Sequence, residues 1–232
     1  MKIRTICSAF SLAAVLSLAA SASATTILLD SNSSTVQFSG YTGSGTIPSN
    51  EESIPNTYNL CTNNCGGGWA NAIGTSDWVS FNPYTGPNSI APGTSFPYPA
   101  PNGTYVYTDT FLGASTDSGT ISVLADDTTS VFLNGNLIAT AAGATQSVCA
   151  TATPNCTTVS TFNLPAADFD NGTNVLTFDV QQLFGGATGL DFEATICAPN
   201  SPISVTPEPC SILMLGTGLL AAAGTIRRRL RA

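Results

Sequence analysis

The sequence predicts an all-β protein folded as a single jelly-roll-type β-sandwich. Short apolar runs of strand length alternate with clusters of turn residues, and the chain contains 21 Gly and 14 Pro, a spacing typical of sandwiches. Helical patterns are absent outside two apolar terminal segments, which predict a signal helix and a transmembrane helix. The stretch between them, residues 25–200, has the length of one such domain.

Residues 1–24 predict a signal peptide. Lys2 and Arg4 precede an apolar stretch at residues 9–20, and Ala22-Ser23-Ala24 has the small-x-small pattern of a cleavage site. The mature chain is therefore expected to begin at Thr25, with an uncleaved anchor as the alternative.

The first half of the domain predicts few strands and long loops. Strands are expected at residues 26–29, 35–38 and 78–81. Residues 43–59 are polar, and residues 82–102 contain six prolines. Because proline cannot donate to a strand ladder, the second segment is expected to be an extended surface loop.

The second half predicts most of the sandwich. Thr and aromatic residues alternate in several runs, as in half-buried strands. The expected strands are residues 104–112, 119–125, 158–164, 173–181 and 188–196, with a hairpin over 130–140. Asn134-Gly135 suits the positive φ angles of a tight type I′ turn in that hairpin.

The charges of the chain are segregated. It has 6 Lys and Arg and no His, with a net charge of −8. All the basic residues lie outside residues 25–206, at Lys2, Arg4, Arg227, Arg228, Arg229 and Arg231. The domain is therefore purely acidic, which argues against nucleic acid as a partner. Without His or Lys it cannot use serine–histidine or Schiff-base catalysis either. The functions that this composition leaves open are chemistry by carboxylate groups and the binding of cations.

The cysteines of the domain predict local disulfides. Cys61 lies near Cys65, and Cys149 lies near Cys156, so the favoured prediction is one disulfide in each pair. A four-cysteine zinc site is the alternative, although these spacings suit zinc poorly. Cys197 is left over, to pair with Cys210 or another chain or to stay buried.

Three groups of residues are candidate ligand or catalytic sites. Asp168, Asp170, Asn171 and Asn174 form an oxygen-rich loop that could hold calcium as a cofactor; ordinary turn chemistry is the alternative. Asp126 and Asp127 could also be ligands, but a turn is the favoured interpretation for them. Trp69, Trp78, Tyr84 and Tyr98 could form a platform for stacking on sugars, with packing as the default.

The last expected strand has two chemically different faces. Leu190 and Phe192 point to one side, and Asp191 and Glu193 point to the other. The acidic face is expected to be solvated. A pair of catalytic carboxylates is the less favoured interpretation.

Residues 201–232 predict a membrane-associated tail. Pro207-Glu208-Pro209 precedes an uncharged, mostly apolar run at residues 211–226, and Arg227, Arg228 and Arg229 follow. Arginines after an apolar run keep that end in the cytoplasm and stop translocation. The prolines keep the tripeptide extended and accessible.

Two segments resemble known families. Residues 78–196 resemble the galactose-binding-like jelly rolls of carbohydrate-binding modules and lectin-like proteins, through residues 105–111, 125–127, 130–135 and 169–176. The resemblance implies the scaffold; no loop position matches a binding motif, and the ligand-binding residues stay unknown.

The tail resembles the PEP-CTERM sorting signal, also called the ice-binding-protein C-terminal domain, of Gram-negative bacteria. Pro207, Glu208 and Pro209 match its motif, residues 213–226 match its spanning run, and Arg227, Arg228 and Arg229 match its basic end. The resemblance implies processing by an exosortase and association with extracellular polysaccharide.

Together these patterns predict a non-catalytic protein exported across the inner membrane. It is expected to be anchored by its carboxyl-terminal helix and then sorted to the cell surface or extracellular matrix. A dedicated carbohydrate-binding module is the first alternative, and a carboxylate-based glycosidase is the second.

Overall fold

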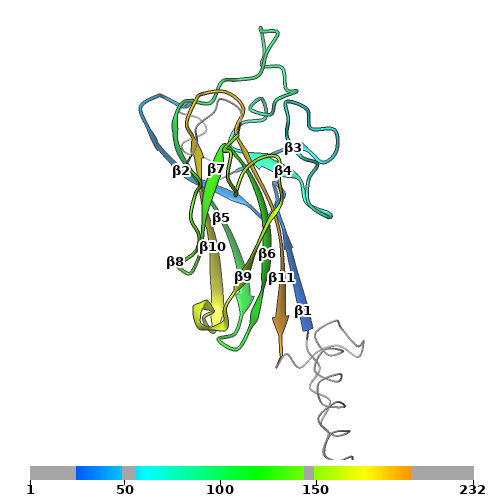
Figure 1. The fold of residues 1–232 in the computed structure, drawn as a ribbon, viewed down its shortest axis with the longest axis vertical. Coiled ribbons are helices and arrows are strands. Elements are labelled where there is room, and N and C mark those ends of the chain that lie inside the picture. The colour runs from blue at the N-terminus through cyan, green and yellow to red at the C-terminus, as the bar shows by residue number, and fades with distance from the viewer. Residues whose placement is uncertain (1–24, 49–55, 144–148, 200–232) are drawn as a thin grey trace, which may run out of the picture. The chain divides into compact units, whose positions relative to one another are not determined.

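The computed structural model describes residues 25–48, 56–143 and 149–199. Residues Thr26–Ala198 form a compact unit, a sandwich of two antiparallel β-sheets (Figure 1). Within the described ranges, no helix combines the length and apolarity needed to cross a membrane. The signal helix and transmembrane helix expected at the two ends lie outside the described residues.

Each sheet combines strands from distant parts of the chain. The first sheet has the order β3 (Tyr58–Cys61), β4 (Trp78–Ser80), β11 (Gly189–Ala198), β6 (Ser118–Asp126) and β9 (Ser160–Leu164), with β1 (Thr25–Asp30) also paired to β11. The second sheet has the order β2 (Gln37–Gly43), β5 (Gly103–Gly113), β10 (Gly172–Gln182), β7 (Thr128–Leu133) and β8 (Asn136–Ala139). A short 3₁₀ turn, η2 (Ala166–Asp168), precedes β10.

The main core lies between the two sheets and follows from period-2 alternation. Along β10, Leu176, Phe178 and Val180 are buried while their neighbours are less so. The ring of Phe178 stacks on that of Phe192 from β11, with centroids 4.6 Å apart. Since successive strand side chains point to opposite faces, this alternation gives each sheet its inner surface.

The strands and the hairpin expected in the second half of the chain are confirmed. The expected strand at residues 104–112 is β5, and the one at 173–181 is β10. Asn134 and Gly135 connect β7 to β8 with φ angles of 52° and 81°, as a type I′ turn requires. Residues 82–102 contain no strand, only an isolated bridge at Ala100.

The outer face of the first sheet differs from the expectation of a solvated surface. A second cluster of buried residues covers it, built from Trp69, Trp78, Leu124, Cys65, Cys149 and Cys156. The segments around the two disulfides supply most of this cluster. Part of the sheet is therefore buried on both faces, so period-2 alternation does not predict which residues meet water there.

Candidate functional site

Two of the connections between the sheets meet at the same end of the sandwich. The first crossover joins β6 to β7 through the single residue Asp127. The second joins β10 to β11 through residues 183–188. The proline-rich residues 82–102 lie at this end too. Figure 1 shows these residues and the second crossover there, opposite the β5–β6 turn. We call this region the crossover end.

Trp69 and Trp78 lie beneath this region, within the second cluster. Their rings stack with centroids 4.1 Å apart, and both side chains are buried. The Trp78 indole N–H donates to the carbonyl of Ala70 at 3.0 Å. The two tryptophans therefore pack against each other and offer no exposed sugar-stacking platform. Tyr84 and Tyr98 are only half-buried.

The disulfides predicted from spacing are present. Cys61 is bonded to Cys65, and Cys149 is bonded to Cys156, with Cα–Cα distances of 5.5 and 5.7 Å. Cys197 is also disulfide-bonded. A carboxylate oxygen of Asp126 lies within 4.8 Å of the sulfurs of Cys149 and Cys156. These sulfurs are bonded to each other, so they supply no thiolate to a metal.

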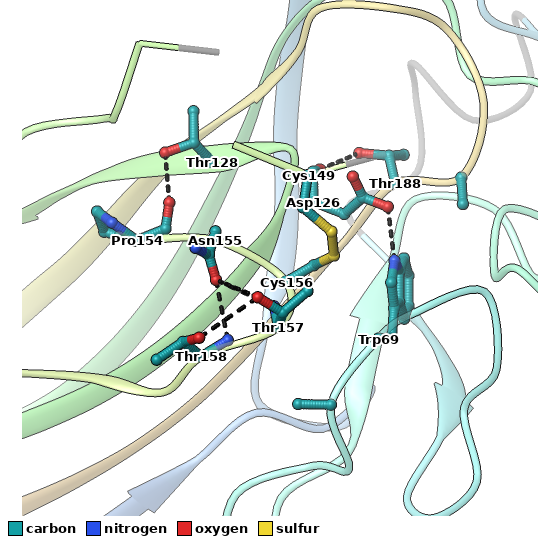
Figure 2. The surroundings of a disulfide bond; sticks show 12 residues. Trp69, Asp126, Thr128, Cys149, Pro154, Asn155, Cys156, Thr157, Thr158 and Thr188 are labelled. Atoms are coloured by element: carbon teal, nitrogen blue, oxygen red, sulfur yellow. Dashed lines mark hydrogen bonds between the residues drawn. A yellow bond between two sulfur atoms is a disulfide. The ribbon is translucent and has the colours of Figure 1, made fainter. Parts of the chain in front are cut away.

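Asp126, at the end of β6, is buried between Trp69 and the Cys149–Cys156 disulfide (Figure 2). The Trp69 indole N–H donates to its Oδ2 at 2.6 Å, and the Thr188 hydroxyl donates to its backbone carbonyl at 3.0 Å. Burial raises the pKa of Asp126 most strongly; the Trp69 hydrogen bond lowers it, and the neighbouring charge of Asp127 raises it further. The carboxyl group is thus favoured in its protonated form.

Asp127 holds the second crossover through its side chain. The Leu183 N–H donates to its Oδ2 at 2.7 Å, and the Phe184 N–H also donates to this carboxylate. Its own N–H donates to the carbonyl of Gln181 at 3.0 Å, and its carbonyl accepts from Ala150 at 3.1 Å. The peptide bond between Asp126 and Asp127 is cis. These residues were expected to form a turn and not to bind a ligand; the structure shows that both are buried and join three segments.

The loop closed by the Cys149–Cys156 disulfide is hydrogen-bonded to the strands on both sides of Asp127. The Thr128 hydroxyl donates to the carbonyl of Pro154 at 2.7 Å (Figure 2). The Ala125 N–H donates to the carbonyl of Asn155 at 3.2 Å. The side chain of Asn155 accepts from the N–H groups of Thr157 and Thr158. Both ends of the first crossover are thereby bound to this loop.

At the crossover end, the proline-rich residues 82–102 are hydrogen-bonded to the second crossover, residues 183–188. Ala100 N–H donates to Gly186 at 2.8 Å, and Thr188 N–H donates to Thr85 at 3.1 Å. These loops carry three large apolar side chains that face solvent: Ile90, Phe96 and Phe184, which are 64%, 61% and 47% exposed. Sequence reasoning missed them, because an exposed aromatic residue has the same local pattern as a buried one.

Asp191 and Glu193 are not a free pair on a solvated face. Asp191 is 0% exposed. Its Oδ1 accepts from the hydroxyls of Ser31 and Ser76, and its Oδ2 accepts from Ile73 N–H at 2.9 Å. The segment before β4 covers the strand here, which corrects the expectation. Burial, the largest effect, raises the pKa of Asp191 to about 6 despite these hydrogen bonds.

The candidate calcium loop uses its amide groups internally. Asn174 is buried, and its Oδ1 accepts from Asp170 N–H and from the Asn134 side chain. Its Nδ2 donates to the carbonyls of Asp170 and Gly172. Asn171 Oδ1 accepts from Ser115 N–H at 3.0 Å. These hydrogen bonds account for the position of Asn174 as a turn residue, and calcium binding with Asp168 stays a prediction.

The sorting motif, Pro207, Glu208 and Pro209, and the basic end, Arg227, Arg228 and Arg229, lie outside the described residues. No family model matches the chain. No curated protein matches it either. The resemblance of the tail to a sorting signal therefore stays a prediction.

Solved carbohydrate-binding modules are among the structures similar to this chain. CBM35 from Cellvibrio japonicus Abf62 is 14% identical with a TM-score of 0.32, and the match covers 75% of this chain and 97% of that chain. A family 35 module from Clostridium thermocellum is 12% identical with a TM-score of 0.30, covering 75% and 97%. One from an environmental isolate is 15% identical with a TM-score of 0.32, covering 78% and 99%. At these TM-scores the similarity shows no function for this chain.

Proposed function

We propose that this chain is an exported, non-catalytic β-sandwich protein that binds neutral polysaccharide at its crossover end. The observation that carries the proposal is the exposure of Ile90, Phe96 and Phe184 on two loops that are hydrogen-bonded to each other. Aromatic faces surrounded by polar groups are a common means of holding ligands with apolar and hydroxyl surfaces.

The charge of the domain narrows the class of polysaccharide. No Lys, Arg or His occurs between residues 25 and 206, so a polyanionic chain would meet only repulsion. Asn88 and Asn102 lie on the same proline-rich segment as Phe96, and their amides can bond sugar hydroxyls. A neutral polymer rich in hydroxyl groups fits this surface best.

The arrangement of the acidic residues supports a binding role over hydrolysis. Asp191, the candidate acid of the glycosidase alternative, is covered by Ser31, Ser76 and Ile73. A glycosidase needs two carboxyl groups that reach the scissile bond from opposite sides. Asp191 has no path to such a substrate in this fold.

Export and sorting complete the proposal. Residues 1–24 would direct secretion, and Pro207-Glu208-Pro209 with the following apolar run would hold the chain for an exosortase-type enzyme. The protein would then act at the cell surface or in the extracellular matrix. Deleting Pro207-Glu208-Pro209 tests this part: unprocessed protein should accumulate in the membrane, and identical processing of the deletion and wild type would contradict it.

The binding proposal is tested by affinity electrophoresis or pull-down with a panel of insoluble and soluble polysaccharides. Neutral polymers should retain the protein, and anionic polymers of similar size should not. Retention by anionic polymers alone, or by none of the panel, would contradict the proposal.

A further inference from the structure

The two aspartates at the first crossover are consecutive residues, and both of their side chains are buried, with exposures of 3% for Asp126 and 2% for Asp127. Two adjacent carboxylates that are out of water and have no cation beside them repel each other, so the pair retains one proton. The Leu183 N–H donates to Oδ2 of Asp127 and stabilises a negative charge there. This contact leaves the proton to Asp126.

The other contacts fit this assignment. Asp127, as the ionised member, accepts the N–H groups of Leu183 and Phe184. Backbone N–H groups favour a carboxylate as their acceptor, because charge-assisted hydrogen bonds are the stronger ones. Asp126, as the neutral acid, accepts from the Trp69 indole N–H and keeps its own proton available to Asp127.

Among the residues that the structure describes, no positively charged side chain lies around Asp126 and Asp127 that could replace this proton in neutralising the pair. The residues packed around the pair belong to β7, β10, β11 and the segments of Trp69 and Cys149–Cys156, and none is a Lys, Arg or His. The acids of these elements are Asp179 on β10 and Asp191 and Glu193 on β11, and Asp77 follows the Trp69 segment. The charge that acts on Asp126 is that of Asp127.

We propose that Asp126 and Asp127 share one proton, and that this proton fixes residues 183–188 so that Phe184 is positioned at the crossover end. Removing the proton would leave two adjacent buried carboxylates. Their repulsion and desolvation are relieved when one of them reaches water, and this movement gives up the hydrogen bonds to Leu183 and Phe184. Asp126 and Asp127 are thus positioning residues for the binding loop.

The shared proton makes the position of residues 183–188 depend on pH in one direction. If opening the loop exposes Asp126 to water, its pKa returns to about 4. The open form then binds the proton less tightly than the closed form. The ratio of open to closed loop should therefore rise by up to about tenfold for each pH unit above that value, until Asp126 ionises in the closed form as well.

The loop itself is tested by hydrogen exchange of the Leu183 and Phe184 amides, measured by NMR between pH 5 and 8 and corrected for intrinsic exchange. Their protection should fall as the pH rises. In Asp126→Asn, whose amide donates to Asp127 without titrating, protection should become independent of pH. Asp179→Asn is the matched control and should keep the wild-type slope. Constant protection in the wild type, or an unchanged slope in Asp126→Asn, would overturn the proposal.

A second measurement needs no variant. Carboxyl ¹³C shifts of the wild-type protein at pH 7 should show Asp126 protonated and Asp127 ionised, and two ionised groups would overturn the shared proton. This keeps the proposal testable even if Asp126→Asn does not fold.

The extension to binding rests on the function proposed above. Affinity for a neutral polysaccharide should weaken over the same pH range in the wild type, and much less in Asp126→Asn. If protection of the loop changes with pH while affinity does not, the proton link stands and the role of Phe184 in binding is refuted.

Discussion

The indole N–H of Trp69 donates to Oδ2 of Asp126 at 2.6 Å, joining residues 57 positions apart in the sequence. Trp69 belongs to the segment that covers the first sheet, and Asp126 ends a strand of that sheet. The bond therefore fastens the covering segment to the crossover end and satisfies one oxygen of a buried carboxyl group. Losing it would leave that oxygen without its donor.

Trp69→Phe should lower the free energy of unfolding more than Trp78→Phe. Both changes remove the same volume and one indole N–H, but the Trp78 donor meets a backbone carbonyl of Ala70. The bond to the buried carboxyl group should add about 1–2 kcal/mol to the loss for Trp69→Phe. Urea denaturation followed by circular dichroism measures both, and an equal or smaller loss in Trp69→Phe would contradict the expectation.

Stability should rise on mild acidification. Burial, the largest effect in each case, raises the pKa values of Asp191 and Asp109 to about 6. Because each folded pKa lies above the unfolded value of about 4, the folded state binds these protons more tightly. The contribution is therefore full below pH 4, is lost between pH 4 and 6, and is constant above. For Asp191 it is on the order of 3 kcal/mol.

The melting temperature measured at a series of pH values checks this sign. It should increase as the pH falls from 6 to 4, and Asp191→Asn should flatten the dependence over that range. Glu193→Gln, on the same strand, serves as the control with the wild-type slope. A melting temperature that falls between pH 7 and 5 would contradict the prediction.

Removing the exposed aromatic rings should weaken polysaccharide binding without unfolding the protein. Phe96→Ala and Phe184→Ala each remove an exposed ring from the crossover end, and each should reduce affinity by roughly tenfold, since a stacking contact is worth about 1 kcal/mol or slightly more. Leu112→Ala is the matched control. Leu112 is 74% exposed but lies at the far end of β5. Isothermal titration gives the affinities, and equal losses in all three variants would rule out the crossover end as the binding surface.

Asn174→Ala should destabilise the protein in the absence of any metal ion. The Asn174 side chain makes four hydrogen bonds in a fully buried site, to Asp170, Gly172 and Asn134. Leaving those partners unsatisfied should cost about 2–4 kcal/mol. Thermal melts in a chelator measure the loss. Adding calcium to wild type tests the metal separately, since a melting temperature raised by calcium and restored by chelator would support binding by Asp168 and Asp170.

Trypsin should leave the processed protein uncut even when it is unfolded. The basic residues all lie outside residues 25–206, so removal of the signal peptide and cleavage beside Pro207-Glu208-Pro209 would leave no trypsin site. Intact-mass measurement before and after digestion in denaturant checks both events together. A cut at Arg227 or beyond in secreted protein would show that the tail is retained.

Local sequence patterns were sufficient for the strands of the second half and for the hairpin at Asn134-Gly135. Both depend on interactions between residues close in the chain: the alternation of side chains along a strand, and the positive φ angles at a two-residue turn. The spacing of Cys61 to Cys65 and of Cys149 to Cys156 predicted the disulfides for the same reason, because short loops bring these cysteines together.

Local sequence patterns did not predict which residues of the candidate site are buried. Asp126-Asp127 matched a turn, a pattern that does not predict burial, and Asp191 matched the wet side of a strand. Segments distant in the sequence cover both places: Trp69 and the Cys149–Cys156 loop cover Asp126, and Ser31 and Ser76 close over Asp191. The expectation of a solvated face was wrong at Asp191 for this reason.

The sequence by itself determined that the domain is an acidic, cation-free β-sandwich with local disulfides, because composition and short-range spacing carry that information. The tertiary structure decided which carboxyl groups lose contact with water and which aromatic rings keep it. Burial of Asp126 and exposure of Phe184 depend on how two crossovers and two covering loops meet at one end of the sandwich. That meeting is a long-range property of the fold, and it sets both the protonation of the aspartates and the surface offered to a ligand.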